Sequence, residues 1–257
     1  MTDPTGRHLE ELPAAQSDDP REALPTDLDE HPLAEIPRPY TREAMDAREQ
    51  EIKDDILRMG SLVAERILDA IVALEAHDAE AAAAVIAHDE DINAMEHRVS
   101  DLITLTIATQ QPVARDLRFL LALDRVAYDL ERMGDYAASV AKQARKLAPV
   151  APLRGHVHLP EMGRLAAAMV RGVLEAVVET DAERARIVAR QDDELDELYH
   201  AIFAETLDLM RADPDNVDPG ERIIFAAHYL ERVGDRVTNI AEDVVFLATG
   251  EVTELNE

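Results

Sequence analysis

The chain of 257 residues is 47% hydrophobic and carries 54 acidic against 26 basic residues, which gives a formal net charge of −28. A surface this acidic repels nucleic acid and anionic lipid, so we expect no nucleic-acid partner. The absence of cysteine excludes disulfides, thiolate zinc sites and thiol nucleophiles, and any metal must therefore be bound by oxygen or imidazole.

Residues 1–40 have a composition unlike the rest of the chain. They hold 7 of the 13 prolines and ten acids against three arginines, with no helical period. Such a segment cannot form a packed core, and we predict a disordered N-terminal extension. The N-terminus also lacks a basic start followed by an apolar stretch, and no apolar run is long enough to span a bilayer. We therefore expect a cytoplasmic protein.

The remainder is rich in strong helix formers and poor in strand formers, a composition typical of an all-α fold. From Thr41 onward, apolar residues recur at three- and four-residue steps, which indicates an amphipathic helix. Asp78 suits the N-cap of a second helix, and Pro112 suits the first turn of a third. The predicted helices, which close a bundle over residues 41–149, span about 42–76, 79–110 and 112–148.

The second half, residues 150–257, follows the same plan. It begins with a connector, residues 149–160, that contains three prolines and a glycine. Asp181 suits an N-cap, and residues 213–220 are typical of a turn. The predicted helices span about 160–179, 182–211 and 220–249.

The two halves are related by an internal repeat. Residues 77–97 align with residues 180–200 at a shift of 103, and residues 130–148 align with residues 230–248 at a shift of 100. The second alignment needs no gap and contains Leu-Glu-Arg-x-Gly-Asp in both copies. We therefore predict two tandem, pseudo-symmetric three-helix bundles.

Each copy of the motif places two acids on one helix face, Glu131 with Asp135 and Glu231 with Asp235. Two like charges four residues apart destabilise a helix by about 0.2–0.5 kcal/mol. The glycine before each aspartate costs a further ~1 kcal/mol relative to alanine, although it lets a neighbouring group approach closely. Because both halves keep these unfavourable features, we predict a cation at each motif.

The acidic pairs belong to longer polar stripes. In the second half the stripe contains His228, Glu231, Asp235, Thr238, Asn239 and Glu242, and in the first half Asp124, Tyr128, Glu131, Asp135, Ser139 and Lys142. Carboxylate and amide oxygens suit iron, zinc, manganese, magnesium or calcium, and we count Asn239 among the candidate ligands. The alternative is a solvated acidic face balanced by Arg132 and Arg232.

Asp116 and Asp213 lie near the turns that precede the motif helices. Each is 15 or 18 residues before its own motif glutamate, too far along one helix to share an ion with it. If the two motif helices pack antiparallel, however, the start of each meets the end of the other. Both aspartates are therefore candidate ligands, with helix capping as the alternative.

A different class of function is suggested by Glu197 and His200, which form the Glu-x-x-His spacing of ferritin-like di-iron proteins. A carboxylate-bridged di-iron oxidase or metal-storage bundle needs this motif on two helices, and His97 has no glutamate three residues before it. We find no nucleophile and no glycine-rich phosphate loop near the histidines, and expect no enzymatic activity.

The two Leu-Glu-Arg-x-Gly-Asp segments, the second of which continues as RVTNIAEDVVFLATGE, resemble the signature of the PhoU family. The resemblance covers residues 42–251 and includes QPVARDLR before the third helix. It implies two three-helix bundles and clustered iron or zinc at Glu131, Asp135, Glu231 and Asp235. The resemblance also implies a role as a negative regulator of phosphate uptake and of the phosphate-starvation response.

Members of this family couple the ATPase subunit of the phosphate ABC transporter to a sensor histidine kinase. The resemblance therefore implies these two partners, and an association with the membrane only through them. We also expect a homodimer, because long bundle helices leave apolar flanks. The acidic first 40 residues have no counterpart in the usual family pattern.

Overall fold

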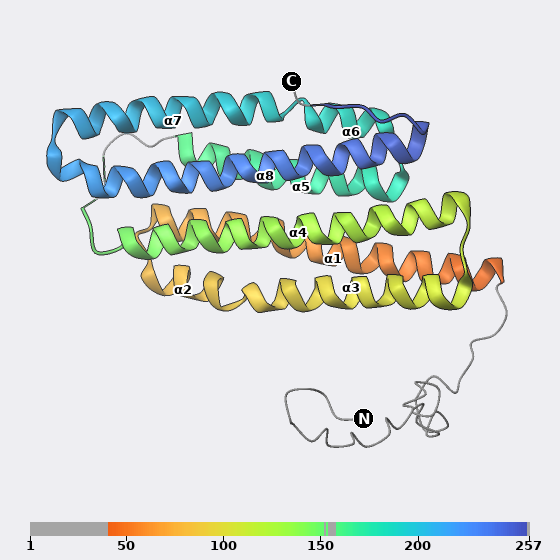
Figure 1. Ribbon diagram of the computed structural model, residues 1–257. Coiled ribbons are helices and arrows are strands. Elements are labelled where there is room, and N and C mark those ends of the chain that lie inside the picture. The colour runs from red at the N-terminus through yellow and green to blue at the C-terminus, as the bar shows by residue number, and fades with distance from the viewer. Residues whose placement is uncertain (1–40, 152, 154–157, 256–257) are drawn as a thin grey trace, which may run out of the picture. The chain divides into compact units, whose positions relative to one another are not determined.

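The computed structural model describes residues 41–151, 153 and 158–255, and every element in them is helical (Figure 1). The predicted disorder of residues 1–40 and the middle of the predicted connector lie outside the described residues. The elements are α1 (Arg42–Glu75), α2 (Ala79–Ala87), α3 (Asp89–Gln110), α4 (Ala114–Leu147), α5 (His158–Glu179), α6 (Ala182–Ala189), α7 (Asp192–Ala212), η3 (Pro214–Asn216) and α8 (Val217–Thr249).

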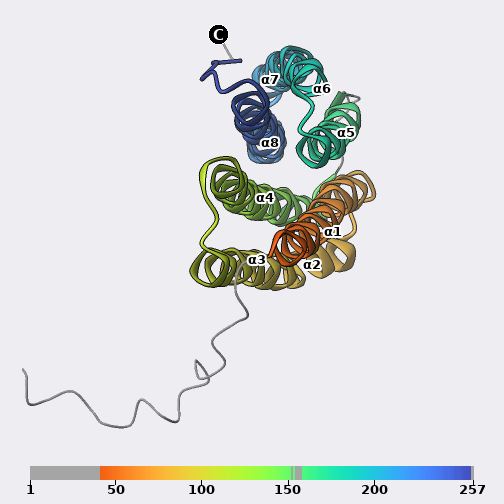
Figure 2. The same ribbon diagram turned by 90° about the vertical axis from the view of Figure 1, so that its right-hand side faces the viewer.

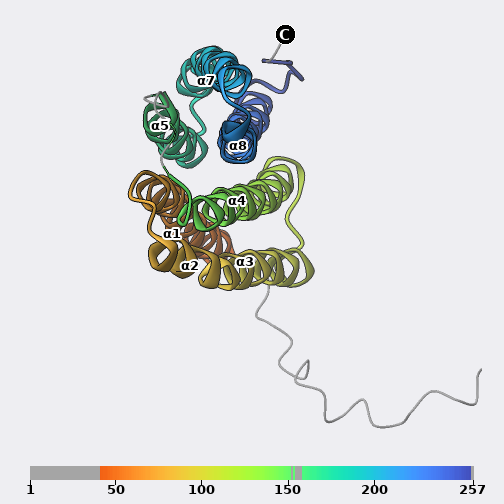
Figure 3. The same ribbon diagram turned by 90° about the vertical axis from the view of Figure 1, so that its left-hand side faces the viewer.

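The helices form two bundles that repeat one plan, as predicted. The first bundle contains α1, α4 and the α2/α3 pair, and the second contains α5, α8 and the α6/α7 pair. Views along the helices show α1 and α4 facing α5 and α8, with α2/α3 and α6/α7 on the outer sides (Figures 2 and 3). The helices α4 and α8 that carry the two acidic motifs therefore pack against each other at the junction of the repeats.

The predicted second helix of each half is broken in the structure, so the expectation of single helices over 79–110 and 182–211 was wrong. The first break falls at His88, whose φ and ψ are −93° and 8°, and the second falls between α6 and α7. Each new helix begins with three consecutive residues rich in acid, Asp89-Glu90-Asp91 and Asp192-Asp193-Glu194. Acids in a first turn stabilise a helix N-terminus, which favours a helix start at these positions.

The predicted caps at Asp78 and Asp181 are confirmed. Oδ1 of Asp78 accepts hydrogen bonds from the backbone N–H groups of Glu80 and Ala81 at 2.9 and 3.0 Å. Oδ1 of Asp181 accepts the equivalent pair at 3.0 and 3.1 Å. The two halves thus start their second helices with the same side-chain bonds.

Two predicted helix starts were wrong. Pro112 does not open the third helix, because it follows Gln111, which ends α3 in the left-handed conformation at φ 48°, and α4 begins at Ala114. A proline just after such a residue stops a helix rather than starting one. The predicted turn at 213–220 is shorter than expected: Asp213 caps η3, and α8 already begins at Val217.

A single hydrophobic core runs through both bundles. The largest fully buried side chains are Met45, Ile52, Ile56, Met59, Ile67, Ile92, Leu120, Leu123, Leu130, Met133, Leu159 and Met162. Between α1 and α5 the packing is reciprocal: Leu174 of α5 fills the space above Gly60 of α1, and Ile71 of α1 fills the space above Gly163 of α5. These four residues are related by the repeat shift of 103, so the two bundles meet in a pseudo-twofold arrangement.

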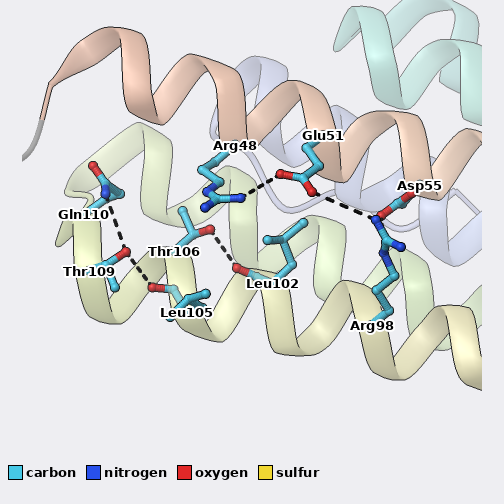
Figure 4. A network of polar contacts seen from close by, with 9 residues as sticks. All are labelled: Arg48, Glu51, Asp55, Arg98, Leu102, Leu105, Thr106, Thr109 and Gln110. Carbon is cyan, nitrogen blue, oxygen red and sulfur yellow. Dashed lines mark hydrogen bonds and ion pairs between the residues drawn. The ribbon is translucent and has the colours of Figure 1, made fainter. Parts of the chain in front are cut away.

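The outer seam between α1 and α3 is polar. Asp55 of α1, which is 4% exposed, accepts hydrogen bonds from Arg58 at 2.9 Å and from Arg98 of α3 at 3.0 Å. Figure 4 shows how Glu51 extends this network to Arg48 and Arg98. Ion pairs therefore close this seam. In the described part of the chain, no helix is both long and apolar enough to cross a bilayer.

Candidate metal centres

The two motif helices, α4 and α8, pack antiparallel, as the sequence interpretation required. Three cross-helix contacts fix their register: Arg125 with Asp243, Asp129 with Arg236, and Tyr136 with Tyr229. The guanidinium of Arg125 donates to both carboxylate oxygens of Asp243, at 2.9 and 2.7 Å, and the two tyrosine rings stack with centroids 6.3 Å apart. In this register the two acidic motifs stand level with each other.

The first motif faces α3, and we call its acids the first centre: Glu131, Asp135, Asp89 and Glu96. Burial raises the pKa of Glu131, and the neighbouring charges of Asp135, Glu96 and Asp89 raise it further, against the opposing effect of Arg132. Burial and the charge of Asp135 likewise raise the pKa of Asp89. The charges of carboxyl groups from α3 and α4 therefore act on Glu131 and Asp89 and disfavour their ionised forms.

The second motif faces α7, and we call its acids the second centre: Glu231, Asp235 and Asp196. Burial raises the pKa of Glu231, and the charges of Asp235 and Asp196 add to that effect, while Arg232 and His200 oppose it. The pKa of Asp196 is raised by burial and by Asp235. The second half thus has an acidic cluster too, in which the motif acids are repeat equivalents of Glu131 and Asp135 while Asp196 corresponds to Asn93.

The acids on α3 and α7 were not among the predicted ligands. The repeat alignment already matched Asp89 with Asp192, so a signal existed, but the sequence does not show which face of the second helix meets the motif. The breaks at the starts of α3 and α7 were not predicted either.

Several buried oxygen atoms at the two centres accept no hydrogen bond from the described residues. Oε2 of Glu131, Oε2 of Glu231, Oδ1 of Asp89 and Oδ1 of Asn93 are inaccessible to solvent and accept no hydrogen bond from any described residue. Oε2 of Glu131 and Oε2 of Glu231 each have a basic neighbour, Arg132 at 3.3 Å and His228 at 3.2 Å. An acceptor buried with no partner at all costs about 1–3 kcal/mol. Carboxylate and amide oxygens are the ligand types that hard and borderline ions prefer.

The side chains do not form a closed coordination site as they stand. Across residues 41–151, 153 and 158–255, no three His, Asp or Glu side chains lie close enough together to hold an ion. Basic groups sit beside the motif acids: Arg132 lies 3.3 Å from Glu131 and 3.2 Å from Asp135, and Nδ1 of His228 lies 3.2 Å from Glu231. The motif glutamates are nevertheless only 18% and 25% exposed, which argues against a freely solvated face.

The motif glycines, Gly134 and Gly234, let side chains of the neighbouring helices α3 and α7 approach the motif helices closely, as predicted. A Cβ at Gly134 would lie 2.9 Å from Cδ1 of Ile92 on α3. A Cβ at Gly234 would overlap Oδ1 of Asp192 and lie 2.6 Å from Leu195 on α7. The absence of a side chain at these positions therefore lets α3 and α7 bring their acids beside the motif.

Three other predicted ligands lie elsewhere. Asp116 accepts a hydrogen bond from Arg42 of α1 at 2.8 Å. Asp213 accepts one from the backbone N–H of Asp215 at 3.0 Å and acts as a cap. Asn239 lines a groove of about 350 Å³ between α4 and α8. The structure thus brings Glu131 together with Asp135 and Glu231 together with Asp235, and gives these three residues other neighbours.

The di-iron alternative receives little support from the geometry. His200 does lie near the second centre, where its charge acts on Glu231. In the first half, however, His97 is 81% exposed on its side chain and pairs with Glu96 beside it. The first half has no Glu-x-x-His at this position, because Ala94 and not a glutamate corresponds to Glu197, so the second copy that this chemistry requires is missing there.

Comparisons with known proteins agree with the repeat. The chain matches the PhoU domain twice, at residues 56–144 and 159–244, and each match contains one acidic motif. A phosphate-specific transport system accessory protein PhoU homolog from Clostridium acetobutylicum is 35% identical over 84% of this chain and its own full length. The protein of the same name from Xylella fastidiosa is 40% identical over 77% of this chain and 82% of its own.

A solved structure gives the same result. The crystal structure of PhoU from Pseudomonas aeruginosa superposes with a TM-score of 0.76 at 34% identity, over 80% of this chain and 99% of that one.

Proposed function

The chain belongs to the PhoU family, and from this membership we propose that it is a negative regulator of phosphate uptake and of the phosphate-starvation response. It acts as a non-enzymatic adaptor between the ATPase subunit of the phosphate ABC transporter and a sensor histidine kinase. The observation that carries this proposal is the double PhoU match, together with coverage of the full length of a relative named as a transport accessory protein.

The adaptor works in the cytoplasm and meets the membrane through its partners, as a homodimer. The adaptor role is tested by capturing the tagged full chain from phosphate-replete cells, with the transporter ATPase and the kinase as the expected partners. Capture of ribosomal or metabolic proteins without any phosphate-transport component would contradict it. Sedimentation of the purified chain tests the dimer.

Metal binding is the second part of the proposal. The groups that would hold the ion are Glu131 and Asp135 with Asp89 and Glu96 in the first centre, and Glu231 and Asp235 with Asp196 in the second. Iron or zinc is expected, and manganese, magnesium and calcium suit the same oxygens. The buried acceptor atoms and the raised pKa of both motif glutamates support this assignment.

The bound ion would supply positive charge. The protein's own contribution is to pack α3 against α4 and α7 against α8, which places acids of each pair near one another. Neutralising the repulsion between these acids would stabilise the packing of each pair of helices. An adaptor needs such a rigid surface to bind its partners. This role of the ion involves no enzymatic turnover.

Elemental analysis tests the metal sites. Glu131→Gln with Asp135→Asn, and separately Glu231→Gln with Asp235→Asn, should each lower the metal content of the purified chain. Glu183→Gln with Asp208→Asn removes the same charge from exposed positions and should leave the content unchanged. Equal metal content in all variants would show that the motifs are not sites.

A further inference from the structure

Aromatic residues are scarce in this chain, which has five tyrosines, four phenylalanines and no tryptophan. Among the described residues, every contact between two rings nevertheless belongs to one continuous series, which runs from α4 across α8 to α7. We call the surface that these rings form the aromatic face. It comprises Tyr136, Tyr199, Phe203, Phe225, His228 and Tyr229.

The ring contacts of the aromatic face cross three helices. Tyr136 of α4 stacks on Tyr229 of α8 with the ring centroids 6.3 Å apart. The centroid of His228 lies 6.2 Å from that of Tyr229 and 6.1 Å from that of Tyr199 on α7. Phe203, one turn further along α7, lies 6.2 Å from Tyr199. The rings therefore form one surface over α4, α8 and α7, which lie side by side (Figure 1).

Part of the aromatic face is open to solvent. Phe203 is 41% exposed and Phe225 is 40% exposed. Phe225 lies three residues before His228, on the same side of α8. Single exposed apolar side chains are common on protein surfaces, but exposed rings that continue a cluster of partly buried rings are typical of surfaces that bind other proteins.

The helix packing does not require these rings. When the two repeat shifts are continued along the helices, the equivalent positions of the first half are polar or charged: Glu96 and Ser100 for Tyr199 and Phe203, and Arg125 and Asp129 for Phe225 and Tyr229. The first half packs α3 against α4 with these residues, as the second half packs α7 against α8. The aromatic side chains are therefore a property of the second half that its fold does not explain.

The surroundings of the aromatic face are acidic. Helix α7 carries seven acids and one arginine. Oε2 of Glu231 lies 3.2 Å from Nδ1 of His228, and after burial the charge of Glu231 is the cause that raises the pKa of Tyr199. A second copy of this chain, whose net charge is −28, would bring two such surfaces together against electrostatic repulsion. A positively charged partner would be attracted.

The rings are also suited to bind guanidinium groups. The guanidinium of Arg232 already lies over the ring of Tyr136, 5.6 Å from its centroid. In the described part of the chain, no arginine or lysine lies over the rings of Tyr199, Phe203 or Phe225. Arginine stacks on aromatic rings more often than lysine does, because its planar guanidinium is less strongly hydrated.

We propose that the aromatic face is the docking surface for a protein segment that carries arginine among apolar side chains. The apolar side chains of the segment cover Phe203 and Phe225, and its guanidinium groups stack on the rings beside the acids of α7. Aromatic residues and arginine are the residue types that contribute most to the affinity of protein interfaces. The inference rests on the proposed adaptor function, to which it adds the surface that binds one of the two partners.

An exchange of residues between the repeats tests the surface. Phe203→Ser with Phe225→Arg introduces the residues that the first half carries, so the variant should keep its helix content by circular dichroism. Its affinity for either the purified transporter ATPase or the purified kinase should fall at least about tenfold, measured by calorimetry with the full chain. The matched control is Leu105→Ser with Leu121→Arg, at residues 49% and 44% exposed on the first half, which should bind like the wild type.

A second pair of measurements tests the chemistry of the partner. Phe203→Leu with Phe225→Leu keeps apolar side chains but removes the rings, and should lower the affinity about threefold or more if guanidinium groups stack there. Photo-cross-linking from Phe203→benzoylphenylalanine to the purified partner, followed by mass spectrometry, should yield a peptide of the partner that contains arginine.

The outcomes separate this inference from the proposed function. If Phe203→Ser with Phe225→Arg binds both partners as the wild type does, or no more weakly than the control, the aromatic face is not the docking surface and the adaptor function stands. Wild-type chain that binds neither partner would overturn both. A variant that loses self-association in sedimentation but retains its partners would assign the face to a second copy. Unchanged affinity of the leucine variant would exclude arginine stacking.

Discussion

Gly234 of α8 faces Asp192 of α7 so closely that a Cβ on the glycine would overlap Oδ1 of the aspartate. The same Cβ would lie 2.6 Å from Leu195. Asp192 is 6% exposed, and its Oδ2 accepts a hydrogen bond from the hydroxyl of Thr238 at 3.3 Å. The glycine is therefore required by the contact between the motif helix and the start of α7.

Gly234→Ala should destabilise the protein, because the gain in helix propensity of about 1 kcal/mol is smaller than the cost of overpacking a buried contact. We expect a net loss of about 1–2 kcal/mol in the free energy of unfolding by urea. Gly134→Ala is the matched control from the first repeat. There the new methyl meets the flexible end of Ile92 at 2.9 Å, and the loss should be smaller.

An unfolding free energy of Gly234→Ala equal to or above that of the wild type would show that Asp192 moves aside freely. The glycine would then have no packing role at this position.

Asp78 and Asp181 give a second prediction, because the two caps make the same pair of bonds in the two repeats. Asp78→Ala and Asp181→Ala should each lower the free energy of unfolding by about 1 kcal/mol, the usual value of a helix N-cap. Asp78→Ser and Asp181→Ser retain a hydroxyl acceptor and should recover most of that loss. A normal stability for either alanine variant would mean that the short helices α2 and α6 are held by packing alone.

The fold could be predicted from the sequence because helix period, caps and repeat all agree. The caps at Asp78 and Asp181 were correct for this reason. The breaks at His88 and between α6 and α7 were not predicted, because no proline or glycine marks them. Acids in the following turn are only a weak local signal. Tertiary packing decides where the helix bends.

The candidate centres were predictable only in part. The i, i+4 acids of α4 and α8 follow from helix geometry, and the structure places each pair in one acidic cluster. The contributions of Asp89 and Asp196 depend on how α3 and α7 rotate against those helices, which depends on contacts between residues distant in the sequence. Asp116 was predicted as a candidate ligand from its place near a helix start. In the structure it accepts a hydrogen bond from Arg42 of α1, a contact that the local sequence does not indicate.

The pair of Asp129 and Arg236 at the repeat junction yields a pH-dependent prediction. Asp129 is 7% exposed, and Arg236 donates to it at 3.3 Å. Burial and the charge of Asp243 raise the pKa of Asp129, while Arg236 and Arg125 lower it. Arg236→Met should therefore raise this pKa further.

A carboxyl whose pKa is raised in the folded state takes up protons on folding. Its favourable contribution is complete below the unfolded pKa of about 3.9 and is lost as pH rises through the folded pKa. Arg236→Met should thus cost about 1–3 kcal/mol at pH 7.5, and less at pH 5. Urea unfolding at the two pH values measures this difference.

Asp129→Asn combined with Arg236→Met removes the buried charge and supplies the control. The double variant should recover part of the stability and lose the extra pH dependence. A penalty for Arg236→Met that is the same at pH 5 and pH 7.5 would contradict the proposed ion pair.

The raised pKa of Glu231 leads to the last prediction, which concerns the metal-free chain. Burial raises this pKa first, and the charges of Asp235 and Asp196 add to it, against Arg232 and His200. The ionised glutamate therefore destabilises the metal-free folded state above its folded pKa. That penalty disappears as pH falls towards the unfolded pKa of about 4.3.

Glu231→Gln, measured in the presence of a chelator, should accordingly be more stable than the wild type at pH 7.5. We expect a gain of at least about 0.2–0.5 kcal/mol, the cost of one like-charge pair at i, i+4, and the difference should shrink towards pH 4.5. Thermal unfolding followed by circular dichroism gives both values. Glu183→Gln, at an exposed acid, should show no comparable gain and serves as the control.

Added metal should make the wild type more stable than Glu231→Gln. An ion that binds only the folded state stabilises that state, and the stabilisation grows with the logarithm of the ion concentration once it exceeds the dissociation constant. The melting temperature of the wild type should rise with Zn²⁺, whereas that of Glu231→Gln with Asp235→Asn should rise less, since only the first centre can then respond. If Glu231→Gln is already less stable than the wild type in chelator, the glutamate makes a favourable contact within the protein itself. In that case the acidic pair does not need a cation to explain its presence.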